Sequence, residues 1–326
     1  MSPRRDGEGG RRRGGGDRVM VPPAEFRSYY GRPIVRPVPW THDIATYLFT
    51  GGLAAGSAVL AAGGQLTRRP ALRRAGRVSA VAAVAASGYL LVKDLGRPER
   101  FLHMLRVAKP TSPMSMGTWI FTGFSAMASV AAAAEAAALL PDRGALGLAR
   151  RALPPVGSAA GIAAAGIAPA LATYTAVLLA DTAHPSWHAV YPELPFLFAG
   201  SALVSGAGAG LIGAPTAEAG PARRMAVAGA ALKLVAGHQA ENGHGLLSEP
   251  YRQGRAATLL KVSQILTGAG AIGAIAGRRS RTVSVLSGLA LLGASLATRM
   301  GIYEGGIESA KDPKYTVVPQ RERLGR

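Results

Sequence analysis

Apolar residues in this sequence are gathered into eight blocks, each separated from the next by a polar stretch. Each block is about 20 to 26 residues long, and a helix of that length crosses the ~30 Å hydrocarbon core of a bilayer. The blocks lie at residues 43–66, 76–95, 115–140, 155–180, 194–213, 222–241, 258–277 and 282–301. The pattern predicts an all-α membrane protein with eight transmembrane helices, in a domain covering residues 41–302.

The composition agrees with this prediction and excludes several other classes of protein. Of the 326 residues, 48% are hydrophobic and 17% are charged, against about 25% charged in soluble domains. The 43 glycines would weaken helices in water, but small residues let helices approach closely in a membrane. The chain has no cysteine, so it provides no disulfide framework, no thiolate nucleophile and no cysteine ligand for zinc or an iron–sulfur cluster.

Positive charge is distributed unevenly among the connections between blocks. Four short connections hold thirteen arginines and two acidic residues, whereas three longer ones hold six basic and five acidic residues. The short connections lie near residues 67–77, 141–153, 214–224 and 278–281, and the longer ones near 96–114, 181–193 and 241–257. By the positive-inside rule the short connections face the cytoplasm of a cell membrane, which places both termini on the outer face. The net charge of +19 is therefore a sign of membrane topology and not of nucleic-acid binding.

The two ends of the chain are polar. Residues 1–40 are rich in arginine, glycine and proline and are expected to be disordered, with an extended lead-in from residue 21 that ends near Trp40. The nine arginines before Thr41 oppose the predicted orientation, because this tail would have to cross the membrane. Residues 303–326 are expected to form a polar carboxyl-terminal tail.

Polar side chains near block ends gather on the face with the long connections. His42 and Asp43 open the first block, Asp94 ends the second, and Tyr174 lies near the end of the fourth. Hydrogen-bonding groups in an apolar wall suit a quinone, whose carbonyl oxygens need donors and whose reduction consumes protons. Each residue alone is also explained as a helix cap, so the hypothesis rests on the set. Further members of the set are Lys93, Asp181, His238, Glu241 and Arg299.

Two ionisable residues lie deeper in their blocks. Glu135 and Lys233 fall well inside apolar segments, where charged groups usually mark a function or a pairing. With Asp94 nearer the surface, they are candidates for a proton relay that extends into the membrane. The alternative is that both are paired structural residues.

The segment at 93–119 is too polar to span a membrane and too aromatic to be a simple spacer. Its RPERFLHMLRV stretch has apolar residues at helical spacing, which predicts an amphipathic helix on the membrane face followed by a proline-rich turn. The same stretch could dock a soluble partner. Candidate docking residues are Arg97, Arg100, Phe101 and Arg106.

The sequence resembles the NrfD/PsrC family of polysulfide-reductase-like membrane subunits over about residues 34–318. The resemblance is carried by KDLGRPERFLHMLRVAKPTSPMSMGTWI at 93–120 and by the YTAVLL segment that begins at Tyr174. It implies eight transmembrane helices in two four-helix bundles, with no haem or metal in this chain. It further implies an iron–sulfur electron-transfer partner, a molybdopterin catalytic subunit, and menaquinone or ubiquinone bound near the outer face.

The resemblance also assigns residues to the quinone. The family's polar pair at the start of the first helix and its tyrosine on the fourth carry over to His42 and Tyr174, with Asp43 adjacent and the loop at Gly96 closing the pocket. Thr-Ala follows Tyr174 where the family has Thr-Gly. The sequence therefore lacks the glycine that would allow a tight backbone contact at this position. The arginine-rich amino-terminal tail has no counterpart in the family.

These observations predict a quinone-binding anchor that passes electrons between the quinone pool and an iron–sulfur subunit. The alternatives are a purely structural anchor that turns over no quinone, a secondary transporter, and a haem-b anchor. A transporter is disfavoured because no proline-interrupted pair of blocks occupies corresponding halves. A haem anchor is disfavoured because the histidines nearest the blocks, His42 and His238, lie at block ends.

Overall fold

The computed structural model describes residues 33–324, and within that range it consists of helices and connecting turns without a strand. The long helices are α1 (His42–Leu66), α2 (Pro70–Asp94), α3 (Pro113–Ala136), α4 (Gly144–Ala180), α6 (Leu194–Gly213), α7 (Gly220–Asn242), α9 (Gly254–Ala276) and α10 (Arg281–Lys311). The short helices are η1 (Pro98–Leu105), η2 (Ala137–Leu139), α5 (Pro185–Ala189), η3 (Gly245–Ser248), α8 (Glu249–Arg252) and α11 (Lys314–Leu324). Residues 1–32, which include most of the tail expected to be disordered, lie outside the described part.

Each predicted apolar block corresponds to one of the long helices. Within residues 33–324, seven helices are long and apolar enough to cross a membrane, and α7 is the long helix that falls short. Its polar content is the reason, because a charged residue at mid-helix and polar residues near both ends lower its mean hydropathy. These residues are Arg223, Arg224, Lys233, His238 and Glu241. The structure also extends α10 to Lys311, ten residues beyond the predicted block.

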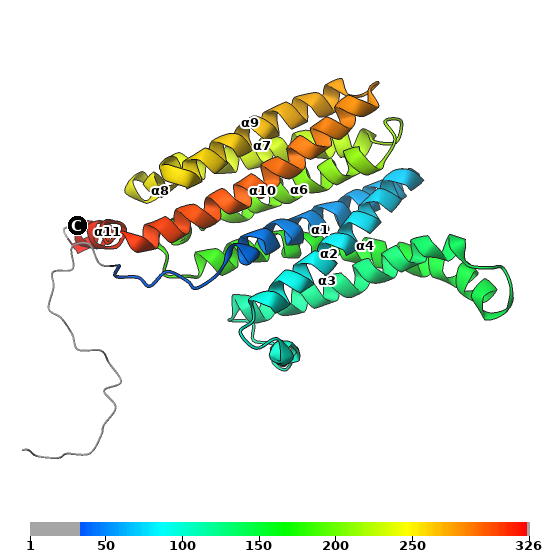
Figure 1. The fold of residues 1–326 in the computed structure, drawn as a ribbon, viewed down its shortest axis with the longest axis horizontal. Helices are drawn as coiled ribbons and strands as arrows, with labels where there is room; N and C mark the ends of the chain where they lie inside the picture. Colours follow the sequence, from blue (N-terminus) through cyan, green and yellow to red (C-terminus); the bar gives the residue numbers. More distant parts are fainter. Residues whose placement is uncertain (1–32, 325–326) are drawn as a thin grey trace, which may run out of the picture.

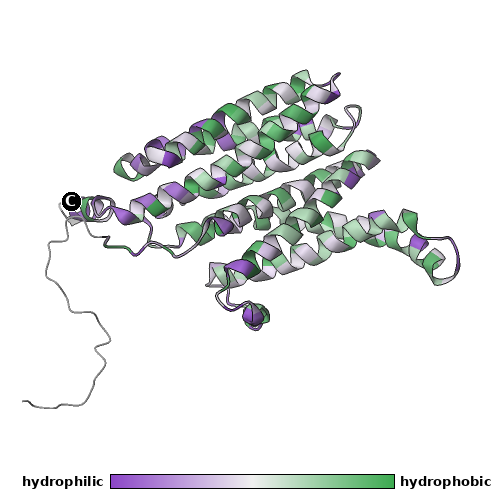
Figure 2. Cartoon of the chain, in the orientation of Figure 1, coloured by the Kyte–Doolittle hydropathy of each residue, from purple (hydrophilic) through white to green (hydrophobic). Residues whose placement is uncertain are grey.

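The connections sort into two ends of the molecule. Figure 1 shows the four short connections at one end of the helix array, and the long connections with the carboxyl-terminal helix α11 at the other. Figure 2 shows that hydrophilic residues concentrate near helix ends and on η1, while the helix surfaces between are mostly apolar or neutral. The division into an arginine-rich face and a long-loop face, read from the sequence, therefore matches the arrangement of the helices.

Small residues bring the central helices into close contact. The helices α1 and α6 pack at the middle of the array, and a side chain added at Gly56 would collide with the backbone of Ala202. Gly206 meets the backbone of Gly56 in the same way. The glycine content is thus used for backbone approach between helices, as expected for a membrane interior.

An aromatic cluster fixes the lead-in segment to the long-loop face. The ring of Trp40 stacks on Trp187 of α5 at 6.2 Å between centroids, and the Tyr303 hydroxyl donates to the Trp40 carbonyl at 2.5 Å. The Trp187 indole donates to the Ile302 carbonyl at 2.8 Å. This packing explains why α10 continues past the apolar block: its outer turns support α5 and the lead-in.

His184, in the loop between α4 and α5, holds the lead-in from the other side. The residue is 1% exposed, and its ring stacks on Trp187 at 4.4 Å and accepts a hydrogen bond from the Val38 amide at 3.3 Å on Nε2. An Nε2 that accepts must be unprotonated, so the neutral imidazole is the form that fits the fold. Burial accordingly lowers the pKa of His184 below its usual value.

The protein is therefore expected to lose stability as the pH falls. The unfolded chain takes up a proton on His184 near pH 6.5, whereas the folded chain does so only at lower pH. The stabilising contribution is complete above about pH 6.5 and declines below it. Thermal unfolding of the detergent-purified protein at several pH values would show this slope, and His184→Gln should flatten it. The exposed His103→Gln serves as control, and an unchanged slope in His184→Gln would contradict the assignment.

Candidate functional site

A cavity of about 310 Å³ lies where the segment at residues 93–120 meets the end of α4. Its wall is formed by the turn before α3, the first turns of α3 and the last turns of α4. The lining residues are Pro110, Thr111, Pro113, Met116, Tyr174, Val177 and Asp181. The proline-rich turn and the Tyr174 segment are both candidate site segments from the sequence. They lie together around one largely apolar pocket, which also contains the Tyr174 hydroxyl and the Asp181 carboxylate.

The turn that forms one wall is held by its own hydrogen bonds. The Ser115 hydroxyl donates to the Val107 carbonyl and accepts from the Lys109 amide, both at 3.0 Å. The Ser112 side chain caps the amino end of α3 by accepting from the Ser115 amide. These local bonds give the proline-rich turn a defined shape beside the cavity.

Tyr174 is positioned by contacts on two sides. Its ring lies against α3 at Gly117, where any added side chain would collide with it. Its hydroxyl is hydrogen-bonded to the hydroxyl of Tyr47 on α1. Tyr47 is buried and packs edge-on against Phe121 at 6.2 Å. Two phenols from different helices thus share one hydrogen bond, and the Tyr174 side chain also lines the cavity.

Polar groups at the ends of α1 and α2 lie between Tyr47 and the long-loop face. Asp43 lies four residues before Tyr47 on α1, so the two side chains share a helix face. The Asp43 carboxylate pairs with Lys93 of α2 at 3.0 Å, and its side chain is 28% exposed. The Asp94 carboxylate accepts a bond from the Thr41 hydroxyl at 3.4 Å. Asp43 therefore lies on the long-loop side of Tyr47, and Asp94 lies at the neighbouring end of α2.

The structure does not bring His42 to this cavity. The His42 ring lies 2.8 Å from the Glu304 carboxylate of α10, which Arg255 of α9 also approaches at 3.6 Å. His42 and Tyr47 are five residues apart, about 140° around the helix axis, so they point to different neighbours. His42 and Tyr174, expected to act on one ligand, thus lie in separate contacts.

The remaining candidate residues for quinone binding and partner docking lie at the surface of the protein, in the segment between α2 and α3. Gly96, Arg97, Arg100 and Arg106 are exposed, and Phe101 is half-buried. The expected amphipathic helix is present as the 3₁₀ helix η1, none of whose residues is fully buried. Leu102 on η1 and Val107 just after it are exposed, so basic and apolar side chains are presented together.

Glu135 lies near the arginine-rich end of α3 and is surrounded by arginines of α2. Its carboxylate lies 2.7 Å from Arg73, 3.0 Å from Arg77 and 3.8 Å from Arg74. Arg77 is itself buried and also donates to the Gln65 side chain at 2.7 Å. The environment of Glu135 is that of a paired carboxylate joining α2 and α3.

Lys233 is buried among α7, α9 and α10. Its ammonium donates to the Ser263 hydroxyl at 2.7 Å and to the Ala294 carbonyl at 3.3 Å, and it also contacts Thr267. A cavity of about 20 Å³ beside it is also lined by Glu241. Such a volume holds about one water molecule. Within the described residues, no hydrogen bond or ion pair links Lys233 to Glu135 or to the residues of the Tyr174 cavity.

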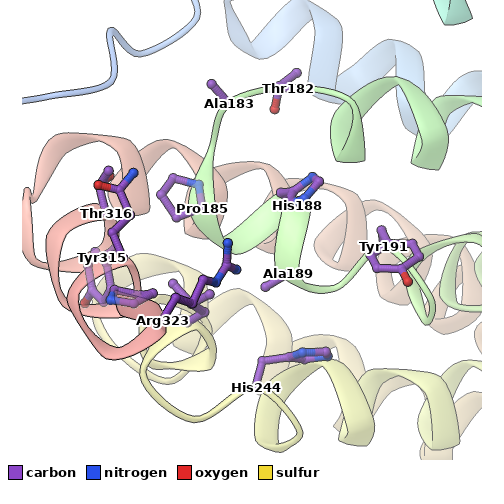
Figure 3. Close-up of a pocket in the computed structure, with 13 residues that line it drawn as sticks. Thr182, Ala183, Pro185, His188, Ala189, Tyr191, His244, Tyr315, Thr316 and Arg323 are labelled. Carbon is purple, nitrogen blue, oxygen red and sulfur yellow. The ribbon is translucent and has the colours of Figure 1, made fainter. Parts of the chain in front are cut away.

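A second cavity, of about 570 Å³, lies on the long-loop face between α5 and α11. Figure 3 shows His188, His244 and Arg323 entering it from three different elements. The His244 ring lies 3.1 Å from the Glu193 carboxylate, and burial raises the pKa of the Tyr315 phenol. No site residue predicted from the sequence lines this cavity, because it is built from short helices that the apolar blocks do not reveal.

Sequence reasoning missed Tyr47 and Gly117 as parts of the Tyr174 site. A signal for Tyr47 was present in its spacing of four residues from Asp43. Gly117 lies inside the segment that carried the resemblance, but its contact with Tyr174 depends on how α3 and α4 pack.

Comparison with known proteins places the chain in a family. A comparison with curated proteins finds no match. The family model for polysulphide reductase, NrfD, matches residues 34–226, which include the Tyr174 cavity and the helices from α1 to α6. More than half of the chain is matched, and the chain belongs to the polysulphide reductase NrfD family of membrane proteins.

Proposed function

We propose that this chain is the quinone-binding membrane subunit of an oxidoreductase complex. It would pass electrons between menaquinone or ubiquinone and an iron–sulfur subunit, which in turn serves a molybdopterin catalytic subunit. The observation that carries the proposal is the cavity formed jointly by the proline-rich turn and Tyr174. Its volume of about 310 Å³ falls at the lower end of the range for small-molecule sites, enough for a ring-sized head group.

The residues of the cavity fit a quinone head group. Met116 and Val177 supply apolar walls, and the Tyr174 hydroxyl is a donor that a carbonyl oxygen requires. When bound, a quinone supplies two-electron, two-proton redox chemistry. Tyr174 would orient the head group, while Tyr47 holds the Tyr174 hydroxyl in place. Asp181 is a second polar group in the wall.

Protons would move between this site and the long-loop face. Asp43 shares a helix face with Tyr47 and reaches partly exposed surface, and Asp94 accepts a hydrogen bond from Thr41 at the start of the same helix. Their carboxylates can take protons from water or release them to it. Glu135 and Lys233 have other contacts, so we propose a short route through Asp43 and Asp94 in place of an inward relay.

We further propose that all eight long helices cross the membrane, as two four-helix groups that meet at α1 and α6. The helix α7 is 23 residues long, which is sufficient for a span, and its charged side chains lie near helix ends except for the hydrogen-bonded Lys233. The arginine-rich short connections would face the cytoplasm, with the quinone site near the outer face.

The surface of η1 is proposed to dock the iron–sulfur partner. Changing both Arg97 and Arg100 to alanine should weaken association about tenfold, or ~1.4 kcal/mol, while the subunit still folds, because exposed side chains contribute little to stability. Co-purification of the partner with the variant measures this. Arg143→Ala, on the opposite end of the molecule, is the control, and full stoichiometry in the double variant would refute docking here.

A binding titration tests the proposed function. A fluorescent quinol-analogue inhibitor, added to the purified protein, should be quenched in a saturable manner. Val177→Trp should abolish the quenching because Val177 lines the cavity, whereas Val156→Trp, an equally exposed position on α4 outside the cavity, should not. Equal quenching in both variants would overturn the site. Absence of quenching in the isolated chain and in the intact complex would favour a purely structural anchor.

A further inference from the structure

We propose that this protein binds an anionic phospholipid in a groove on its membrane-facing side, with the lipid phosphate held by Arg74. The groove has a volume of about 680 Å³ and is bounded by α1, α2, α6 and α10. It is separate from the Tyr174 cavity and shares no lining residue with it. The proposal therefore does not depend on the quinone site.

The shape of the groove fits a hydrocarbon chain. Arg74, Val78, Ala82 and Ala86 follow one another at intervals of four along α2, and all four are exposed. This row is about 18 Å long at 1.5 Å per residue. One leaflet of the ~30 Å hydrocarbon core is about 15 Å thick. An acyl chain entering from the arginine-rich face would therefore run along the groove to about the bilayer midplane.

The walls of the groove are made of small and apolar side chains. The α2 side contributes mainly alanines, and the α6 side contributes Ala209, Ile212 and Gly213. Because these residues are small, helix packing leaves space that another apolar molecule must occupy in a membrane. A lipid chain would complete the contact between α2 and the helices α6 and α10.

Charge at the mouth of the groove favours an anionic head group. Arg73, Arg74 and Arg77 share the single carboxylate of Glu135, and Arg74 is the most distant, at 3.8 Å. Within the described residues, no other carboxylate pairs with these three arginines. The nearby Glu218 is occupied by the amides of Ala71 and Leu72, where it caps α2.

A fourth arginine adds to the positive charge beside the groove. The Arg281 guanidinium donates to the backbone carbonyl of Ala214 at 2.6 Å and contacts that of Ile212. It therefore carries no carboxylate partner in the described structure. Basic pockets between transmembrane helices on the cytoplasmic side are suited to phosphate head groups. A zwitterionic lipid would neutralise less of this charge.

The test is retention of phosphatidylglycerol by the full chain. The protein would be reconstituted in nanodiscs of phosphatidylcholine and phosphatidylglycerol, extracted in detergent, and its bound lipids quantified by mass spectrometry. We expect stoichiometric phosphatidylglycerol on the wild type and a roughly fivefold loss in Arg74→Gln, the effect of one basic contact to an anionic lipid. Arg143→Gln, exposed on the same face but outside the groove, should retain it.

A second variant tests the groove itself. Ala82→Phe fills the exposed middle of the groove without entering the protein core and should also release the lipid. Equal retention by Arg74→Gln and the wild type, or equal retention of phosphatidylcholine, would overturn the proposal. Displacement of the lipid by a quinone analogue would also overturn it, by assigning the groove to a quinone tail. Size-exclusion profiles establish that each variant is folded.

Discussion

Tyr174→Phe is expected to lower kcat for quinol-linked electron transfer by about 10- to 100-fold in the intact complex. The change removes one hydroxyl, and losing a hydrogen bond to a reacting group corresponds to about 1–3 kcal/mol. Phenylalanine keeps the ring that packs against Gly117, so the amount of folded protein and its assembly should not change. Steady-state rates with a soluble quinol and an artificial electron acceptor measure the effect.

Two comparisons sharpen this experiment. Tyr191→Phe removes an exposed hydroxyl at the other cavity on the same face and should leave the rate unchanged. Gly117→Ala keeps the Tyr174 hydroxyl but displaces its ring, so it should also reduce the rate. A wild-type rate in Tyr174→Phe would remove this tyrosine from the reaction, and a loss in Tyr191→Phe would move the site to the cavity beside α5.

The fold was predictable from the sequence as far as helix length and polarity determine it. An apolar run of about 20 residues has few alternatives to a membrane helix, and each such run became a long helix. The outer turns of α10 were missed because residues such as Tyr303 and Glu304 read as a polar tail. In the structure they are helical because Tyr303 bonds to Trp40 and Glu304 faces His42.

For the candidate site, the sequence indicates how close each residue lies to the membrane surface but not which neighbour its side chain contacts. Sequence position places His42, Asp43 and Tyr174 near one face of the membrane, since each lies close to a helix end. It does not say which neighbour each side chain meets, because that depends on how far each helix is rotated in the packed array. Five residues along α1 separate His42, which faces Glu304, from Tyr47, which faces Tyr174. The tyrosine pair of the candidate site could be named only after α1, α3 and α4 were seen together.

Glu135→Gln is expected to destabilise the protein by about 3–5 kcal/mol, the usual effect of removing one partner from a buried ion pair. The side chains of Glu135 and Arg77 are 8% and 5% exposed, so the charge left on Arg77 would have little access to water. The ion pairs between α2 and α3 would be lost with it. Thermal unfolding in detergent should show a large fall in the midpoint, whereas Asp142→Asn, which breaks an exposed pair with Arg151, should change it little.

The same variant separates a structural role for Glu135 from a proton relay. If the carboxylate serves only to balance its arginines, adding Arg77→Met to Glu135→Gln should restore part of the lost stability, because the buried charge is then removed as well. The quinol-linked rate per folded molecule should stay near that of the wild type. A stable Glu135→Gln protein that has lost proton uptake would contradict the structural role and return Glu135 to an inward proton path. We expect the structural role, with stability partly restored in the double variant, because three arginines surround the one carboxylate of Glu135.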